Sequence, residues 1–294
     1  LVIVRYVNLY CLKIKTYKSM PELPEVETVR RGLQPFLEGQ TLKSVVLRRS
    51  GLRIPFPKDL SQRLRGKTVN YLSRRAKYLL MHIEGGDTVI IHLGMSGHMT
   101  ILINNIPKPG KHDHVDFCVS TGVIIRFNDP RRFGLITITS EKELELHRFF
   151  RAIGPDPLTN HFNYTILAAA LIRRKTSVKV ALLDQRIIAG LGNIYVSESL
   201  FRSGISPLRL AHSLKRVEIK KLIKCIREVL IEALEAGGSS LNDHVKPDGK
   251  LGYFQNKHRV YGKEGKICIS CLDVEIKKIK QSGRSTFYCP LCQS

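Results

Sequence analysis

The amino-acid sequence predicts an α+β protein, in which an N-terminal antiparallel β domain, a sandwich or a barrel, is headed by a helix and followed by a helical domain and a C-terminal β-hairpin. Three patterns support this fold class. Apolar residues recur at helical spacing from residue 21 to about 39, and short strand-like runs fill residues 41–140. Amphipathic helical stretches follow residue 162, and paired cysteines end the chain. The two halves are long enough to hold separate hydrophobic cores.

The first predicted element is a helix that opens with the text PELPEVETVRRGL at residues 21–33. Pro21 suits the first turn of a helix, where a backbone N–H is not needed. Glu22, Glu25 and Glu27 follow it, where the positive end of the helix dipole favours anions. One face of this helix is apolar, with Leu23, Val26, Val29 and Leu33.

The next elements are predicted strands, since runs such as DTVIIHLGM and GVIIRF alternate with turn residues such as Gly85-Gly86 and Thr121-Gly122. This pattern indicates an antiparallel sandwich or barrel. The text IGPDPL then holds two prolines and a glycine, which predicts a linker between domains.

After the linker the chain becomes helical. The text LKRVEIKKLIKCIREVLIEALEAGG predicts a long amphipathic helix that ends at Gly237-Gly238, and the polar text after it predicts a loop. We therefore expect an extension outside the fold at 1–20, a sandwich domain at 21–152, a helical domain with a loop at 153–258, and a metal-binding finger at 259–294.

The charge of the chain indicates a polyanionic partner. Lys and Arg number 48 against 25 acidic residues, which gives a net charge of +23. A folded protein this basic gains affinity for nucleic acid by releasing counterions from phosphates. Composition alone fits an RNA-binding protein as well as a DNA-binding one. No apolar run approaches the roughly 20 residues that span a bilayer, so a soluble globular protein is expected.

Two CxxC pairs at the C-terminus predict a metal site: Cys268 with Cys271, and Cys289 with Cys292. Four thiolates satisfy tetrahedral Zn²⁺ and leave no open coordination position, so one structural zinc ion is expected. Free thiols or a redox pair are the alternative interpretation.

The first 19 residues carry four basic side chains and no acidic one. The short apolar stretch is interrupted by Arg5 and lacks a small-residue cleavage site, so a secretory signal is not predicted, whereas an organelle transit peptide is a minor alternative to a cytoplasmic protein. Met20 directly precedes Pro21. This arrangement suggests that translation starts at Met20.

Eight motifs occur in one order along residues 21–293: PELPEVETVRRGL, RRAKYLL, HLGMSG, KHDHVDF, NDPRRFG, GNIYVSESLF, VYGKEG and GRSTFYCPLCQ. In these motifs the chain resembles the formamidopyrimidine-DNA glycosylases. The resemblance implies a β-sandwich, a helix–two-turn–helix domain and a zinc finger. It also implies a monomer that removes oxidised purines from double-stranded DNA and then cleaves the strand by β,δ-elimination.

The resemblance further implies catalytic residues. Pro21 would be the Schiff-base nucleophile, provided that its amine is free, because an amine can capture the sugar carbon as an iminium. Glu22 would be the general acid. Lys77 would assist catalysis and β-elimination, and Arg284 would serve δ-elimination and hold phosphates. In isolation a Pro-Glu helix start and a strand lysine are usually structural.

Six further residues match DNA-contacting positions of the family. Three would fill the space left by the extracted base: Met95, Arg131 and Phe133. Three would hold the DNA: His112, Arg174 and Asn193. Taken singly, Met95 and Phe133 would be assigned to the core.

Two departures from the family pattern concern the finger and the loop. Leu272 stands where many members have glycine, and a positive φ would be strained there. Asn242 stands where members often carry a basic residue, which bears on lesion preference. The alternatives are an oxidised-pyrimidine glycosylase of the endonuclease VIII type and a non-catalytic zinc DNA-binding protein.

Overall fold

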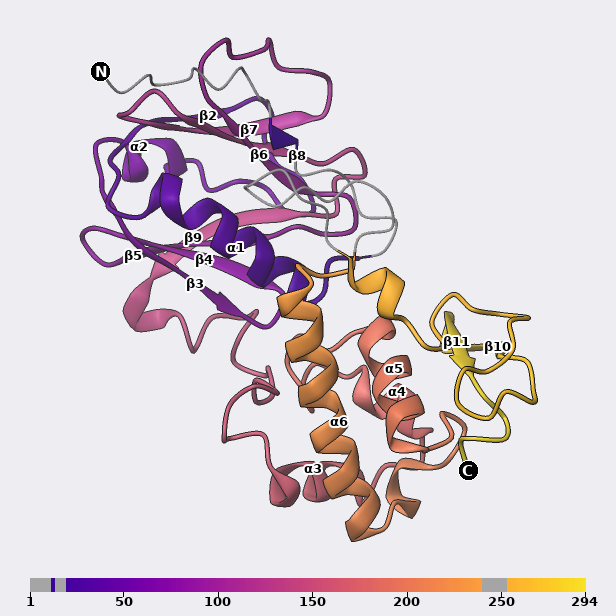
Figure 1. Ribbon diagram of the computed structural model, residues 1–294. Coiled ribbons are helices and arrows are strands. Elements are labelled where there is room, and N and C mark those ends of the chain that lie inside the picture. Colours follow the sequence, from indigo (N-terminus) through magenta and orange to yellow (C-terminus); the bar gives the residue numbers. More distant parts are fainter. Residues whose placement is uncertain (1–11, 14–19, 240–252) are drawn as a thin grey trace, which may run out of the picture.

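The computed structural model describes residues 12–13, 20–239 and 253–294. The predicted loop after residue 239, with Asn242, lies outside these ranges, apart from its last residues. Figure 1 shows two bodies that meet near the N-terminal end of helix α1. Among the described residues, no helix is both long and apolar enough to cross a membrane.

Two antiparallel sheets form the N-terminal body, which confirms the predicted sandwich. Their strand orders are β1-β6-β8-β7-β2 and β3-β4-β5-β9. Inward-facing residues such as Phe117 and Phe127 from one sheet and Leu79 and Ile91 from the other join one buried cluster. The strands are β1 (Leu12–Lys13), β2 (Leu42–Leu47), β3 (Val69–Arg75), β4 (Tyr78–Ile83), β5 (Asp87–His92), β6 (His98–Leu102), β7 (Asp113–Val119), β8 (Ile124–Asn128) and β9 (Leu135–Ser140).

Helix α1 (Leu23–Leu37) heads this body as predicted, and the short helix α2 (Leu60–Leu64) follows β2. The predicted apolar face of α1 is buried, and Val26, Val29 and Leu33 from it join the sandwich core. The helix ends at Leu37 with Glu38 as its C-cap, and Gly39 then adopts a φ of +73°, a conformation that favours glycine.

Strand β1 comes from the segment expected to lie outside the fold. Its two residues pair with Ile101 and Thr100 of β6. The rest of residues 1–19 lies outside the described ranges, so the assignment of that segment stays a prediction.

The second body is helical and has its own buried cluster. It contains α3 (Tyr164–Leu171), α4 (Val178–Leu182), α5 (Asn193–Ser203) and α6 (Arg216–Glu235), and α5 packs along α6 (Figure 1). Short 3₁₀ turns are η1 (Glu141–Glu143), η2 (Ala211–Ser213) and η3 (Phe254–Lys257). The chain ends in the predicted hairpin, β10 (Lys277–Gln281) and β11 (Arg284–Tyr288).

Candidate active site and zinc centre

Glu22 lies where the two bodies meet. It is the N-cap of α1 and only 4% exposed. The backbone N–H of Ile194, at the start of α5, donates to Glu22 Oε1 at 3.4 Å, while Oε2 has no hydrogen-bond partner among the described residues. Burial raises the pKa of Glu22 to about 7, and the charge of Lys77 opposes this rise. A carboxyl with this pKa can both give and take a proton near neutral pH.

A glycine makes room for this carboxyl. A Cβ atom added to Gly192 would lie 2.1 Å from the Glu22 carboxyl carbon, which is closer than atoms can approach. The backbone N–H of Leu23 also donates to the carbonyl of Gly190 at 3.1 Å. The loop before α5 therefore wraps the start of α1 at backbone distance.

A second buried carboxylate, Glu25, ties three segments together. It accepts hydrogen bonds from the backbone N–H of Glu22 at 2.9 Å and of Ser239 at 2.7 Å, and from the hydroxyl of Tyr195. Burial raises the pKa of Glu25, and these donors oppose the rise. Glu25 thus fixes the backbone at Glu22 relative to the end of the segment that follows α6. The sequence places Glu25 only among the anions at the positive end of the helix dipole and does not indicate this link between segments.

Lys77 lies in the turn between β3 and β4 rather than on a strand, and it is buried as predicted. Burial lowers the pKa of Lys77, the charge of Glu22 opposes this effect, and Arg284 reinforces it. Lys77, Arg284 and Met20 line one cavity of about 290 Å³. The structure therefore brings together the predicted lysine, the predicted arginine and the residue that precedes Pro21, while Pro21 itself is buried beside Glu22.

The hairpin that carries Arg284 is anchored at the neighbouring residue. Lys179 Nζ and Asn193 Nδ2 both donate to the carbonyl of Ser285, at 3.0 and 2.9 Å. Lys179 also donates to Thr286 Oγ1 at 2.6 Å, and burial lowers its pKa to about 8. Lys179 is not among the residues predicted from the sequence. A lysine surrounded by apolar residues, as in the text SVKVALL, could have indicated a buried charged side chain.

The three residues expected to fill the space of an extracted base come from two adjoining loops. A Cβ atom on Gly94 would lie 2.4 Å from the backbone of Phe133, so the loops touch at their backbones. The Arg131 guanidinium stacks on the Phe133 ring at 5.0 Å. Phe133 is 46% exposed and Met95 is half-buried, so Phe133 is not a core residue.

The remaining predicted DNA contacts come from separate elements. The carbonyl of His112 accepts from Asp129 N–H at 3.0 Å, which places it beside the loop of Arg131. The Arg174 guanidinium pairs with Asp184 at 3.3 Å. The amide nitrogen of Asn193 holds the hairpin, as described above, while its Oδ1 has no hydrogen-bond partner among the described residues and the side chain is half-buried.

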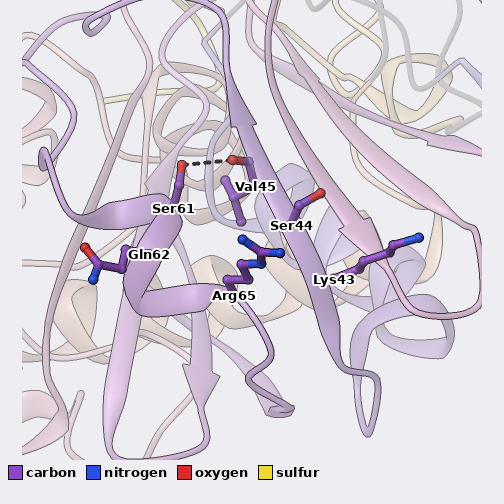
Figure 2. Close-up of a pocket in the computed structure, with 6 residues that line it drawn as sticks. All are labelled: Lys43, Ser44, Val45, Ser61, Gln62 and Arg65. Atoms are coloured by element: carbon purple, nitrogen blue, oxygen red, sulfur yellow. Dashed lines mark hydrogen bonds between the residues drawn. The ribbon is translucent and has the colours of Figure 1, made fainter.

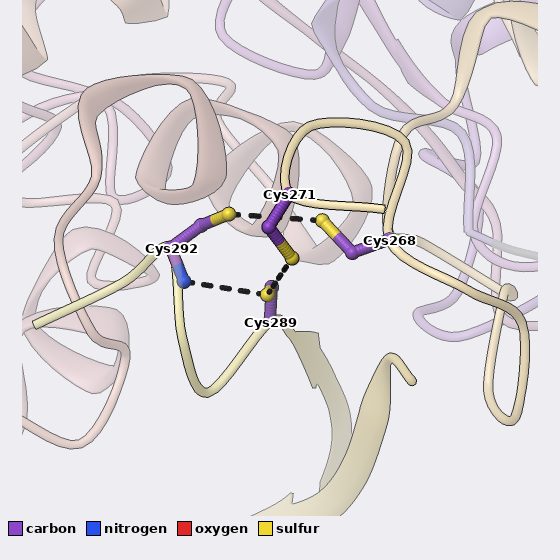
Figure 3. A group of neighbouring side chains, drawn as sticks. All are labelled: Cys268, Cys271, Cys289 and Cys292. Carbon is purple, nitrogen blue, oxygen red and sulfur yellow. Dashed lines mark hydrogen bonds between the residues drawn. The ribbon is translucent and has the colours of Figure 1, made fainter. Parts of the chain in front are cut away.

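The four predicted cysteines form one cluster (Figure 3), and their sulfur atoms all lie within 4.8 Å of one another. The Sγ atoms of Cys268 and Cys292 are 3.8 Å apart, and those of Cys271 and Cys289 are 3.7 Å apart. Tetrahedral thiolates at ~2.3 Å from zinc lie ~3.8 Å from each other, so the cluster fits one structural zinc ion.

The backbone at Leu272, directly after the first pair of cysteines, has the strained conformation that the sequence led us to expect. Leu272 has a φ of +57° and is 75% exposed. Its backbone N–H donates to the carbonyl of Cys268 at 2.9 Å, which closes the knuckle. In the hairpin, Ser282 and Gly283 both have positive φ values, as in the tight turns that suit the twist of paired strands.

Family models match the chain over three ranges. Residues 20–136 match the formamidopyrimidine-DNA glycosylase N-terminal domain, residues 153–245 its H2TH domain, and residues 274–294 a zinc finger found in FPG and IleRS. The chain belongs to the formamidopyrimidine-DNA glycosylase family.

Individual relatives support this membership. Formamidopyrimidine-DNA glycosylases of Cereibacter sphaeroides and Jannaschia sp. are 50% and 51% identical over 283 residues, which cover 93% of this chain and 100% of each relative. The crystal structure of the Thermus thermophilus protein is 38% identical, with a TM-score of 0.82 over 93% of this chain and 98% of that one. A Lactococcus lactis Fpg mutant bound to Fapy-dG DNA is 35% identical, with a TM-score of 0.86 over 93% and 99%.

Proposed function

We propose that the chain excises oxidised purines, 8-oxoguanine and formamidopyrimidines, from double-stranded DNA and then cleaves the strand by β,δ-elimination. The observation that carries this proposal is the buried Glu22 carboxyl, whose pKa lies at about 7 beside Lys77. Lactococcus lactis relatives were crystallised with DNA that contains Fapy-dG or an abasic site, which supports the same substrate here. The enzyme acts as a monomer in the cytoplasm.

Pro21 is the proposed nucleophile. Its secondary amine, once free, bonds to C1′ of the damaged nucleotide as the bond from C1′ to the base breaks, and the base leaves with a proton. The C1′–O4′ bond of the sugar then opens, O4′ takes up a proton, and the nitrogen, which has lost its own proton, forms the iminium with C1′. Glu22 carries protons to and from the sugar, because its raised pKa keeps a large protonated fraction near neutral pH.

The later steps are assigned to the two cations of the cavity. Lys77 has a lowered pKa, so a larger fraction of its amine is neutral and can take up a proton during β-elimination. Arg284 offers a fork of donors to phosphate oxygens during δ-elimination. The zinc ion holds the finger that carries this arginine, and it takes no part in the chemistry.

The exposed loops supply the DNA contacts of this proposal. Met95 and Phe133 fill the space that the extracted base leaves in the base stack. Arg131 donates hydrogen bonds to the opposite base, which has lost its pairing partner. The residues that contact the DNA backbone are His112, Arg174 and Asn193. The division into a sandwich at 21–152, a helix–two-turn–helix domain at 153–258 and a finger at 259–294 belongs to the same proposal.

Borohydride trapping tests the nucleophile. On duplex that contains 8-oxoguanine, reduction should yield a protein–DNA adduct that peptide mapping places at Pro21. Glu22→Gln should bind the duplex and lose excision, whereas Glu145→Gln, a change at an exposed glutamate, should retain it. An adduct at Lys77 would remove the assignment of Pro21. Excision of oxidised pyrimidines in preference to purines would favour the endonuclease VIII type, and binding without cleavage would favour a non-catalytic protein.

A further inference from the structure

A second polar pocket lies far from this site, between strand β2 and helix α2 (Figure 2). Its volume is about 480 Å³. Four residues separate the end of α1 from the start of β2, so the pocket lies near the C-terminal end of α1. The 15 residues of α1 span ~22 Å at ~1.5 Å per residue, which separates the pocket from Glu22. The residues that line it are Lys43, Ser44, Val45, Ser61, Gln62 and Arg65.

The walls of the pocket are held in place by the backbone. Strand β2 is an edge strand that pairs with β7 on one side only. On the other side, Ser61 Oγ donates to the carbonyl of Val45 at 2.8 Å. The N–H of Leu42 donates to the carbonyl of Lys67, and the N–H of Gly66 donates to the carbonyl of Leu42, both at 2.8 Å. The two walls therefore form a fixed frame.

The cations of the pocket have no counter-charge. Lys43 and Arg65 are exposed, and no carboxylate lines the pocket. Within the described part of the chain, neither side chain forms an ion pair or a hydrogen bond. Arg63, on the same helix, differs, since it pairs with Asp87 at 3.0 Å. Figure 2 shows the Arg65 guanidinium reaching from the end of α2 toward β2.

The donors suit one class of ligand. The Arg65 guanidinium fork and the Ser44 hydroxyl lie nearest the space between helix and strand. By contrast, Figure 2 shows the Gln62 amide and the Lys43 ammonium directed outward on either side. A guanidinium fork and a hydroxyl both donate hydrogen bonds, and a phosphate group offers several acceptor oxygens. The volume lies in the range of pockets that hold small molecules, and this favours a phosphate ester over a bare anion. We propose that this pocket binds phosphate esters, either of a free nucleotide or of a nucleic-acid backbone that does not enter the catalytic cavity.

The test follows backbone amide signals of ¹⁵N-labelled protein by NMR, because the amides of Ser44, Val45 and Gln62 report this pocket separately from the catalytic cavity. Pyrophosphate, dAMP and a short lesion-free duplex are titrated in turn. Arg65→Ala should weaken the interaction about tenfold, as expected for a lost charged hydrogen bond. Lys142→Ala, which removes an exposed charge elsewhere, should leave it unchanged.

Each outcome decides the proposal. Shifts with pyrophosphate and dAMP that weaken in Arg65→Ala support it and identify a free nucleotide as ligand. Shifts with the duplex alone, again weakened in Arg65→Ala, support it and identify nucleic acid. No shift with any of the three, or equal affinity in Arg65→Ala and the parent protein, would overturn it. Excision of 8-oxoguanine by Arg65→Ala, measured in parallel, reports the catalytic proposal separately.

Discussion

Replacing Glu22 by glutamine should stabilise the folded protein at alkaline pH and leave its stability unchanged at acid pH. Burial raises the pKa of this carboxyl from 4.5 to about 7. Between these values the folded state binds the proton that the unfolded chain has released, so the stability of the parent protein falls as pH rises through this window. At about 1.36 kcal/mol per pKa unit, the loss amounts to about 3 kcal/mol above pH 7. Glutamine is neutral at every pH, so Glu22→Gln avoids this loss of stability.

Urea unfolding at pH 5 and pH 8 measures this effect. The difference in free energy of unfolding between Glu22→Gln and the parent should rise from about 1 kcal/mol at pH 5 to about 3 kcal/mol at pH 8. Glu145→Gln is the control, because the exposed Glu145 side chain is hydrated in both states. A Glu22→Gln difference that is the same at both pH values would refute the reasoning, since it would mean that the buried carboxyl is not held protonated.

Four further outcomes are expected. The protein should bind one equivalent of zinc, and Cys268→Ala should weaken DNA binding by releasing the finger; metal-free protein that cleaves DNA normally would contradict this. Arg131→Ala should lower excision about tenfold and non-specific DNA binding much less, because phosphate contacts supply most of the non-specific affinity. Equal losses of excision and of binding would mean that Arg131 only contacts phosphate. Gly192→Ala should abolish excision, since its Cβ would displace the Glu22 carboxyl. An active variant would show that the loop before α5 can move to make room for the added methyl group. Native protein should begin at Pro21 by N-terminal sequencing, and an active protein with Pro21 inside an amide bond would defeat the mechanism.

The parts of the fold that could be predicted from the sequence depend on short-range patterns. Helix α1 and the zinc ligands follow from spacings of three or four residues, and the strands follow from runs bounded by turns. Helix α4 could not be predicted because five residues are too few to show a helical period. The positive φ of Leu272 could be expected only because family members have glycine there.

The parts that could not be predicted depend on contacts between distant residues. Glu25 accepts from the N–H of Ser239, which follows it by 214 residues. Lys179 is buried because β11 supplies two acceptors for its ammonium group more than 100 residues later. The need for glycine at position 192 arises from the Glu22 carboxyl on another element. No local pattern carries such information.

These long separations also set an order of events during synthesis. Glu22 and Glu25 meet Ile194 and Tyr195 only after 172 and 170 further residues have been made. At ~5–20 residues per second, the start of α1 stays exposed for roughly 10–30 s after it leaves the ribosome. If translation starts at Met20, as the sequence predicts, that methionine would be open to aminopeptidase during this interval, before the helical body packs against Glu22 and Glu25. Late closure of the fold would then leave time to uncover the amine on which the proposed chemistry depends.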